Sequence, residues 1–239
     1  MTARINWFLV AAAVAVAPSM AGAADLPARM PVKAPAYMAP APVGFSWTGF
    51  YIGANVGWGW SNGDGTFYGL GPVGVPVSGS GDGVLGGGQI GYNWQTGSFI
   101  FGIETDFQGS SGEGDLNGSA GGVAITGGTL KTPWFGTIRG RIGYAPWDRG
   151  MIYVTGGGAY GHLDYDGTLS TTGPFSSSTN YWTWTVGAGV EAFLWDRWSA
   201  KLEYLYVGTP DNFPVPPGTV AADGNTNTNI VRAGLNYHF

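Results

Sequence analysis

Two acidic residues separated by a single residue, Glu104 and Asp106, form a carboxylate pair that could act in catalysis. Such a pair divides general acid and general base roles when one member has a raised pKa. The sequence also carries two basic residues at the same spacing, Arg139 and Arg141. Nearby arginines would keep both carboxyl groups ionised. We therefore interpret these residues as ion-pair partners and predict that the protein is not an enzyme.

The same alternate spacing recurs in later segments of the chain, and it gives a set with equal numbers of acids and bases. A buried charge is tolerated only when it is paired. We predict a charge network inside a β-structure that side chains largely fill, and a narrow conducting path between the pairs remains the alternative. The predicted network consists of Glu104, Asp106, Arg139, Arg141, Glu191, Lys201, Glu203 and Arg232.

Other residue types limit the chemistry further. The chain has no cysteine, which excludes disulfides, thiolate metal sites and cysteine nucleophiles. Its two histidines, His162 and His238, are accompanied by neither a nucleophile elbow nor a second clustered ligand. We interpret His238 as structural. His162 is a weak candidate for axial haem contact, and Phe67 and Tyr68 are candidates for stacking on a planar ligand.

Nucleotides and nucleic acids are also disfavoured as ligands. The G-x-G-x-x-G patterns beginning at Gly69 and Gly156 lack the strand–turn–helix context that nucleotide binding requires. Four polar segments predicted as loops hold acids and no Lys or Arg, whereas nucleic acid needs a basic footprint. No calcium-loop spacing is present, so we predict no metal site and no cofactor. The loop acids are Asp64, Asp82, Glu113, Asp115, Asp166, Asp211 and Asp223.

The charged residues lie in segments that alternate between apolar and polar positions, as strands of a transmembrane barrel do. In the last segment, residues 228–239, Val231, Ala233, Leu235, Tyr237 and Phe239 are apolar, and polar or small residues separate them. About eight such segments follow Trp47; the fifth, near residues 151–165, is blurred by glycines, and its faces are not assigned. A soluble sandwich or lipocalin-like barrel would instead bury its apolar face inward.

The connections alternate in length, as they do in outer-membrane barrels. Residues 95–98, 145–150 and 195–198 read as tight turns, and residues 61–83, 109–129, 166–180 and 208–226 read as long loops. Pro133 is expected near the end of its strand, where no ladder donor is needed. The predicted fold is all-β: an eight-stranded antiparallel up-and-down transmembrane β-barrel with four long outer loops, closed by pairing of its first and last strands.

The N-terminal region predicts export. Arg4, an apolar run over residues 7–17 and Ala21-Gly22-Ala23 match a signal peptide over residues 1–23. Residues 24–46 are rich in Pro and Ala and are expected to form an extended periplasmic linker. The linker is either a spacer or a tether to peptidoglycan or a partner. The barrel is assigned to residues 47–239.

Three stretches carry a family resemblance: the linker AADLPARMPVKAPAY, the first strand WTGFYIGANVGWGW and the terminal VRAGLNYHF. Together with the signal peptide they resemble the alphaproteobacterial outer-membrane immunogenic protein family, which has an OmpA-like eight-stranded β-barrel. The resemblance implies an outer-membrane surface location, a porin-like classification and, in some relatives, haemin binding. It also implies that Leu235, Tyr237 and Phe239 match the terminal signal read by the barrel assembly machinery.

These observations lead to one principal hypothesis, a surface barrel that supports the envelope or contacts the host or environment. The expected partners are outer-membrane lipid, lipopolysaccharide and the barrel assembly machinery. A small-solute porin and a haemin-binding receptor are the alternatives, and a lipid-modifying enzyme is a more distant one.

Overall fold

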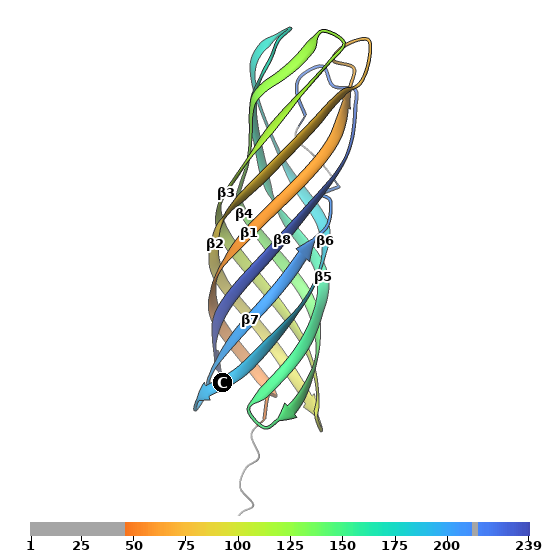
Figure 1. Ribbon diagram of the computed structural model, residues 1–239. Coiled ribbons are helices and arrows are strands. Elements are labelled where there is room, and N and C mark those ends of the chain that lie inside the picture. Colours follow the sequence, from red (N-terminus) through yellow and green to blue (C-terminus); the bar gives the residue numbers. More distant parts are fainter. Residues whose placement is uncertain (1–45, 212–214) are drawn as a thin grey trace, which may run out of the picture. The chain divides into compact units, whose positions relative to one another are not determined.

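A computed structural model of the chain describes residues 46–211 and 215–239. In these residues eight antiparallel strands each pair with the next, and β1 also pairs with β8, so the sheet closes into a barrel (Figure 1). The strands are β1 Gly49–Tyr68, β2 Val75–Thr96, β3 Phe99–Ala120, β4 Val123–Trp147, β5 Gly150–Leu169, β6 Gly173–Trp195, β7 Trp198–Val207 and β8 Ala221–His238. The predicted fold class and closure are confirmed.

The described residues contain no helix that is long and apolar enough to cross a membrane. The predicted signal peptide, residues 1–23, and the predicted linker up to residue 45 lie outside the described residues.

Side chains alternate between the outside and the lumen because successive residues of a strand point to opposite faces. On β1 the outward side chains of Phe50 and Ile52 are 60% and 51% exposed, whereas Tyr51 between them is fully buried. The structure also assigns the blurred fifth strand: Ile152 faces outward, and Met151 and Tyr153 are buried inside. The barrel therefore has an apolar outer surface and a lumen filled by a different set of residues.

Three two-residue turns lie at one end of the barrel, which we call the turn end. They are residues 97–98, 148–149 and 196–197, as the sequence predicted, and Gly97 and Asp196 adopt positive φ there. The C-terminus lies at the same end (Figure 1). Buried apolar side chains pack inside the lumen near this end: Trp47, Ile100, Met151, Tyr153 and Phe193.

The opposite end, which we call the loop end, corrects the predicted loop lengths. The segments predicted as loops at 61–83, 109–129 and 166–180 are mostly strand, and the connections are only residues 69–74, 121–122 and 170–172. Only the β7–β8 connection, residues 208–220, is long. The runs of Gly and Ser suggested loops because glycine weakens a strand. The backbone ladder needs no particular side chain, however, so these hairpins continue as strands through the Gly and Ser runs and carry a few buried apolar residues such as Phe67 and Val77 on the inward face.

Pro133 also differs from expectation, because it lies within β4 and not near its end. The β4–β5 register shifts between Lys131 and Phe135, and the β3–β4 register shifts in the same region. A β-bulge is one of the few places inside a sheet where a residue without an N–H is tolerated. After the bulge, the inward positions of β4 include Phe135, Thr137 and Arg139, which brings the arginines into the lumen.

Candidate functional site in the barrel lumen

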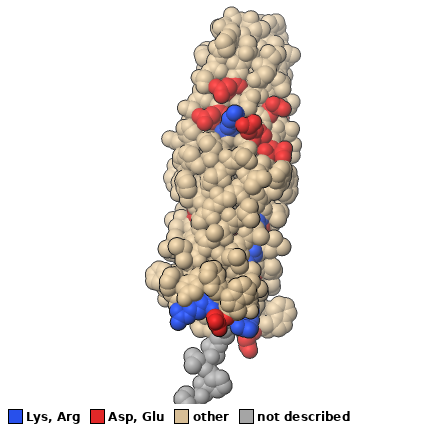
Figure 2. Space-filling model, turned by 90° about the vertical axis from the view of Figure 1, so that its left-hand side faces the viewer, with Lys and Arg blue, Asp and Glu red and all other residues tan. Residues whose placement is uncertain are grey.

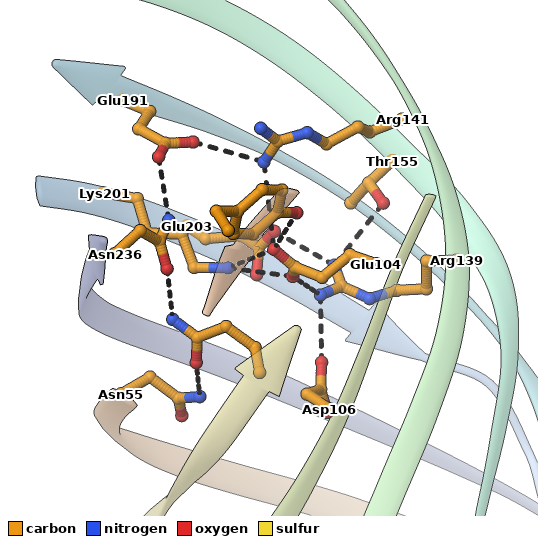
Figure 3. A network of polar contacts seen from close by, with 12 residues as sticks. Asn55, Glu104, Asp106, Arg139, Arg141, Thr155, Glu191, Lys201, Glu203 and Asn236 are labelled. Carbon is orange, nitrogen blue, oxygen red and sulfur yellow. Dashed lines mark hydrogen bonds and ion pairs between the residues drawn. The ribbon is translucent and has the colours of Figure 1, made fainter. Parts of the chain in front are cut away.

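A layer of charged side chains fills the middle of the lumen, and the eight residues predicted from the sequence form it; Figure 3 labels all of them except Arg232. Each is only 1–3% exposed. Residues two apart on a strand share a face, so the pairs Glu104/Asp106, Arg139/Arg141 and Lys201/Glu203 all enter the lumen. The remaining two members of this charge layer, Glu191 on β6 and Arg232 on β8, complete equal numbers of acids and bases.

One ion pair of the charge layer joins two strands on opposite walls of the barrel. Lys201 Nζ on β7 donates to both carboxylate oxygens of Glu104 on β3, at 2.8 and 2.7 Å. In the closed ring β3 and β7 are separated by three strands on either side. This ion pair therefore spans the full width of the lumen.

Two arginines link the other acids into the same network. Arg139 lies 2.6 Å from Glu104, 3.0 Å from Asp106 and 3.0 Å from Glu203. Arg232 lies 2.9 Å from Asp106 and 2.6 Å from Glu203. Glu104, Asp106 and Glu203 thus each face more than one cation, which offsets the cost of removing these charges from water. In these contacts Glu104 and Asp106 are ion-pair partners of buried basic residues.

A second group of contacts lies around Glu191 and includes a serine and a histidine. Arg141 pairs with Glu191 at 3.2 Å, and Ser199 Oγ donates to Glu191 at 2.5 Å. His238 Nε2 lies 2.9 Å from Ser199 Oγ and 3.4 Å from Glu191. A catalytic triad needs the two imidazole nitrogens to contact different partners. Here one nitrogen contacts both partners in a buried setting, which fits a structural role for His238.

Uncharged polar residues that the sequence prediction of the charge network did not include extend the charge layer. Tyr51 donates to Glu104 at 2.8 Å, Thr137 to Asp106 at 2.7 Å and Asn236 to Glu191 at 2.8 Å. For Thr137 and Asn236 the available signal was parity, since each shares its strand's inward face with a member of the charge layer, whereas β1, which carries Tyr51, holds no member. Five buried polar atoms of the layer and its surroundings have no hydrogen-bond partner: Asn55 Oδ1, Asn93 Nδ2, Gln108 Oε1, Arg141 Nη2 and Arg232 Nη1.

The structure does not bring the three candidate haem-contact residues together. His162 lies on the outward face of β5, where it stacks on Trp134 with ring centroids 6.1 Å apart and contacts Asn180 at 2.8 Å. Phe67 is buried in the lumen, whereas Tyr68 points outward and donates to Asp223 at 3.3 Å. Phe67 and Tyr68 therefore cannot stack on the same face of one ligand.

The residues of the predicted assembly signal lie on the outward face of β8 or just beyond it. Leu235 and Phe239 are exposed, and Tyr237 packs between Trp198 and Phe239, with ring centroids 5.3 and 5.2 Å away. The backbone N–H of Phe239 donates to the carbonyl of Phe50 at 3.0 Å. The chain end is thus fixed to β1.

Charges on the outer surface gather toward the two ends of the barrel. Figure 2 shows mostly acidic side chains toward the loop end, with a basic one among them, and both basic and acidic side chains at the turn end, with a broad band of mostly other residues between them. Among the acids, Glu113 pairs with Lys131 at 3.1 Å, and both side chains are exposed. No group of three or more metal-ligating side chains occurs in residues 46–211 and 215–239.

Comparisons with known proteins agree with this architecture. The chain matches the family profile described as outer membrane protein beta-barrel domain over residues 9–239. It is 38% identical to the 31 kDa outer-membrane immunogenic protein of Brucella melitensis, over 92% of this chain and 96% of that protein. It is also 38% identical to the 22 kDa outer membrane protein of Rhizobium leguminosarum, over 70% and 67%. The crystal structure of OprG from Pseudomonas aeruginosa matches 80% of this chain and 96% of its own, with a TM-score of 0.46 and 11% identity.

Proposed function

We propose a function on the premise that this chain belongs to the outer membrane protein β-barrel family and resides in the outer membrane. On that premise it is a surface barrel that supports the envelope or contacts the host or environment, and it does not conduct solutes. Outer-membrane barrels place their short turns in the periplasm, so the loop end would face outward.

The observation that carries this proposal is the ion pair between Lys201 and Glu104, which joins opposite walls of the lumen at 2.7–2.8 Å. An eight-stranded barrel has an interior just wide enough for side chains to fill. A solute passing along the axis would have to separate this pair and the arginine contacts beside it. Leaving a buried charge without its partner is costly, which supports a closed lumen.

Liposome swelling tests the proposal. Proteoliposomes that contain the folded barrel should swell in an arabinose gradient no faster than protein-free liposomes. Swelling that rises with the amount of folded barrel would contradict the closed lumen. The envelope role predicts that a deletion strain becomes more sensitive to EDTA and detergent, and that the wild-type gene restores resistance.

A small-solute porin is the second candidate, and one observation favours it. The unpartnered buried atoms Gln108 Oε1 and Arg232 Nη1 are groups that buried water ordinarily satisfies. A chain of such waters through the charge layer would provide a narrow path. Swelling with arabinose, or with the smaller solute glycine, would favour this candidate over the closed barrel.

A haemin receptor has less support, because His162 and Phe67 lie on opposite sides of the barrel wall. The outward His162 would have to bind haemin at the surface. Haemin titration of the purified barrel tests this: a Soret shift that His162→Ala abolishes would support the receptor, and the absence of any shift would remove it.

The proposed partners follow from the outer surface. Aromatic side chains that point outward, including Trp58, Trp182 and Trp184, suit contact with lipid at the membrane interfaces. Lipopolysaccharide would be the lipid at the outer interface. We propose that Leu235, Tyr237 and Phe239 are the contact for the barrel assembly machinery, because they present an apolar edge at the chain end.

A further inference from the structure

The loop-end half of the lumen is less filled by side chains than the middle, where the charge layer lies. The inward positions of β1 and β2 in this half carry almost no side chain: Gly59, Ser61 and Gly63 on β1, and Gly79, Gly81 and Gly83 on β2. These residues pair across the β1–β2 hairpin, so they form one continuous wall of small residues. Such a wall leaves space that larger inward side chains would occupy.

Apolar side chains from the other strands bound this space. Leu85, Phe135, Val207 and Ile230 form a buried cluster on the side of the charge layer. Phe67, Val77 and Tyr165 belong to a second buried cluster nearer the loop end. Between these clusters lies a cavity of about 470 Å³. This volume falls within the range of about 300–1,000 Å³ that is usual for small-molecule pockets.

One buried polar group lies at the edge of the cavity without a protein partner. The hydroxyl of Tyr165 makes no hydrogen bond, although the residue is fully buried and lines the cavity. It lies beyond the outward apolar stretch of β5, which ends near Tyr160. Burial raises the pKa of Tyr165 to about 12, so it remains a neutral donor. A ligand that accepts this hydrogen bond would remove the cost of the unsatisfied group.

The lining of the cavity offers no partner to an anion. The described residues that line it include no Lys, Arg or His, and its acids Asp82, Glu113 and Asp223 lie at outward positions of their strands. An anionic ligand would lose its hydration without gaining a cationic partner.

We propose that this cavity binds a small, mostly apolar molecule that carries no negative charge and accepts one hydrogen bond from Tyr165. The site lies on the loop-end side of the charge layer, so binding there requires no passage through the barrel. This inference goes beyond the proposed envelope role and is independent of whether the charge layer conducts.

Methyl NMR of the full-length, refolded barrel in micelles tests the proposal with two matched probes, neutral 2-naphthol and anionic 2-naphthalenesulfonate. Inward methyl groups of Leu85, Val207 and Ile230 report the cavity. The outward methyl groups of Ile138 and Val190 report partition into the micelle. We expect saturable shifts of the inward methyl groups with 2-naphthol and none with the sulfonate. Absence of inward shifts with 2-naphthol, or equal affinity for the two probes, would overturn the proposal.

Two glycine substitutions form the matched controls. A Cβ at Gly59 would lie 3.5 Å from both Ile230 and Leu85, so Gly59→Leu places a side chain in the cavity without a backbone clash at Cβ. Gly86 lies on the outward face, where a Cβ would be 3.5 Å from its nearest neighbour, the Asn55 carbonyl. Gly59→Leu should weaken 2-naphthol binding about tenfold because the new side chain occupies the part of the cavity beside Leu85 and Ile230, whereas Gly86→Leu should leave it unchanged. Equal affinity in these two folded variants would overturn the cavity site.

Tyr165→Phe provides a test that leaves the cavity volume nearly unchanged. It should weaken 2-naphthol binding by about two- to tenfold, as expected for one hydrogen bond, and leave naphthalene binding unchanged. Tyr165→Phe therefore still tests binding in the cavity if Gly59→Leu does not fold. An unchanged ratio of 2-naphthol to naphthalene affinity would overturn the role of Tyr165.

Discussion

Replacing Lys201 by methionine removes the cation that joins the two walls of the lumen and keeps a side chain of similar length. Lys201 Nζ and the Glu104 carboxylate are both buried, and their atoms lie 2.7–2.8 Å apart. Removing one partner of a buried pair costs about 3–5 kcal/mol. Glu104 keeps Arg139 at 2.6 Å. We therefore expect the free energy of unfolding to fall by about 3 kcal/mol, the lower end of that range.

The assay is urea unfolding of the barrel in lipid vesicles, followed by tryptophan fluorescence. With a slope of about 1–3 kcal/mol per molar urea, the midpoint should fall by about 1–3 M. Lys131→Met is the matched control, because its ion pair with Glu113 has the same residue types, lies at 3.1 Å and is 47% and 62% exposed. Exposed pairs contribute at most about 1 kcal/mol, so its midpoint should barely move.

The double variant Lys201→Met/Glu104→Gln separates charge imbalance from lost packing. It leaves three acids and three bases in the charge layer, and we expect it to be more stable than Lys201→Met alone. The reasoning is refuted if Lys201→Met and Lys131→Met cost the same, or if the two changes at positions 104 and 201 simply add.

Three further predictions concern the wall and the chain end. A Cβ at Gly87 would overlap the carbonyl oxygen of Phe107, whereas a Cβ at the adjacent Gly86 would lie 3.5 Å from its nearest neighbour. Gly87→Ala should therefore cost about 1–3 kcal/mol in unfolding assays and Gly86→Ala almost nothing; equal costs would contradict the close approach of β2 and β3 at Gly87. Ile138 faces outward in the middle of β4 and Asn62 faces outward near the loop end. In vesicles, Ile138→Arg should lower the free energy of unfolding by about 2–4 kcal/mol and Asn62→Arg by at most about 1 kcal/mol. The reverse order would contradict the placement of Ile138 in the membrane and of Asn62 outside it. Phe239→Ala should lower the amount of heat-modifiable barrel in outer-membrane fractions more than it lowers stability after refolding; matching losses would indicate a purely structural role for Phe239.

Much of the charge layer could be predicted because the alternation of a strand fixes which side chains share a face. All eight charged residues that the sequence placed in the lumen are buried there, and Glu104 meets Arg139 in the predicted β3–β4 pairing. The contact of Lys201 with Glu104 was not predicted. It crosses between strands that are not neighbours, and strand order alone does not show which side chains lie at the same height in the lumen.

The loop-end half of the barrel was harder to predict for a different physical reason. Its strands contain many glycines and serines, as in Gly79–Gly83 of β2, and these residues have low strand propensity. These residues pair because each hairpin continues the register of the strands in the membrane part. No local sequence pattern in the loop-end half indicates this pairing. The β4 bulges, including the one at Pro133, also change the parity of the inward positions, so a strict alternation fails there.

Planar-bilayer recording tests the central claim, a lumen closed by the charge layer, most directly. The folded wild-type barrel should give no stable, reproducible channels. A variant that removes the bridging side chains, Glu104→Ala/Lys201→Ala, should show more frequent openings if it folds. Stable channels of uniform conductance from the wild-type barrel, unchanged in the double variant, would contradict the claim.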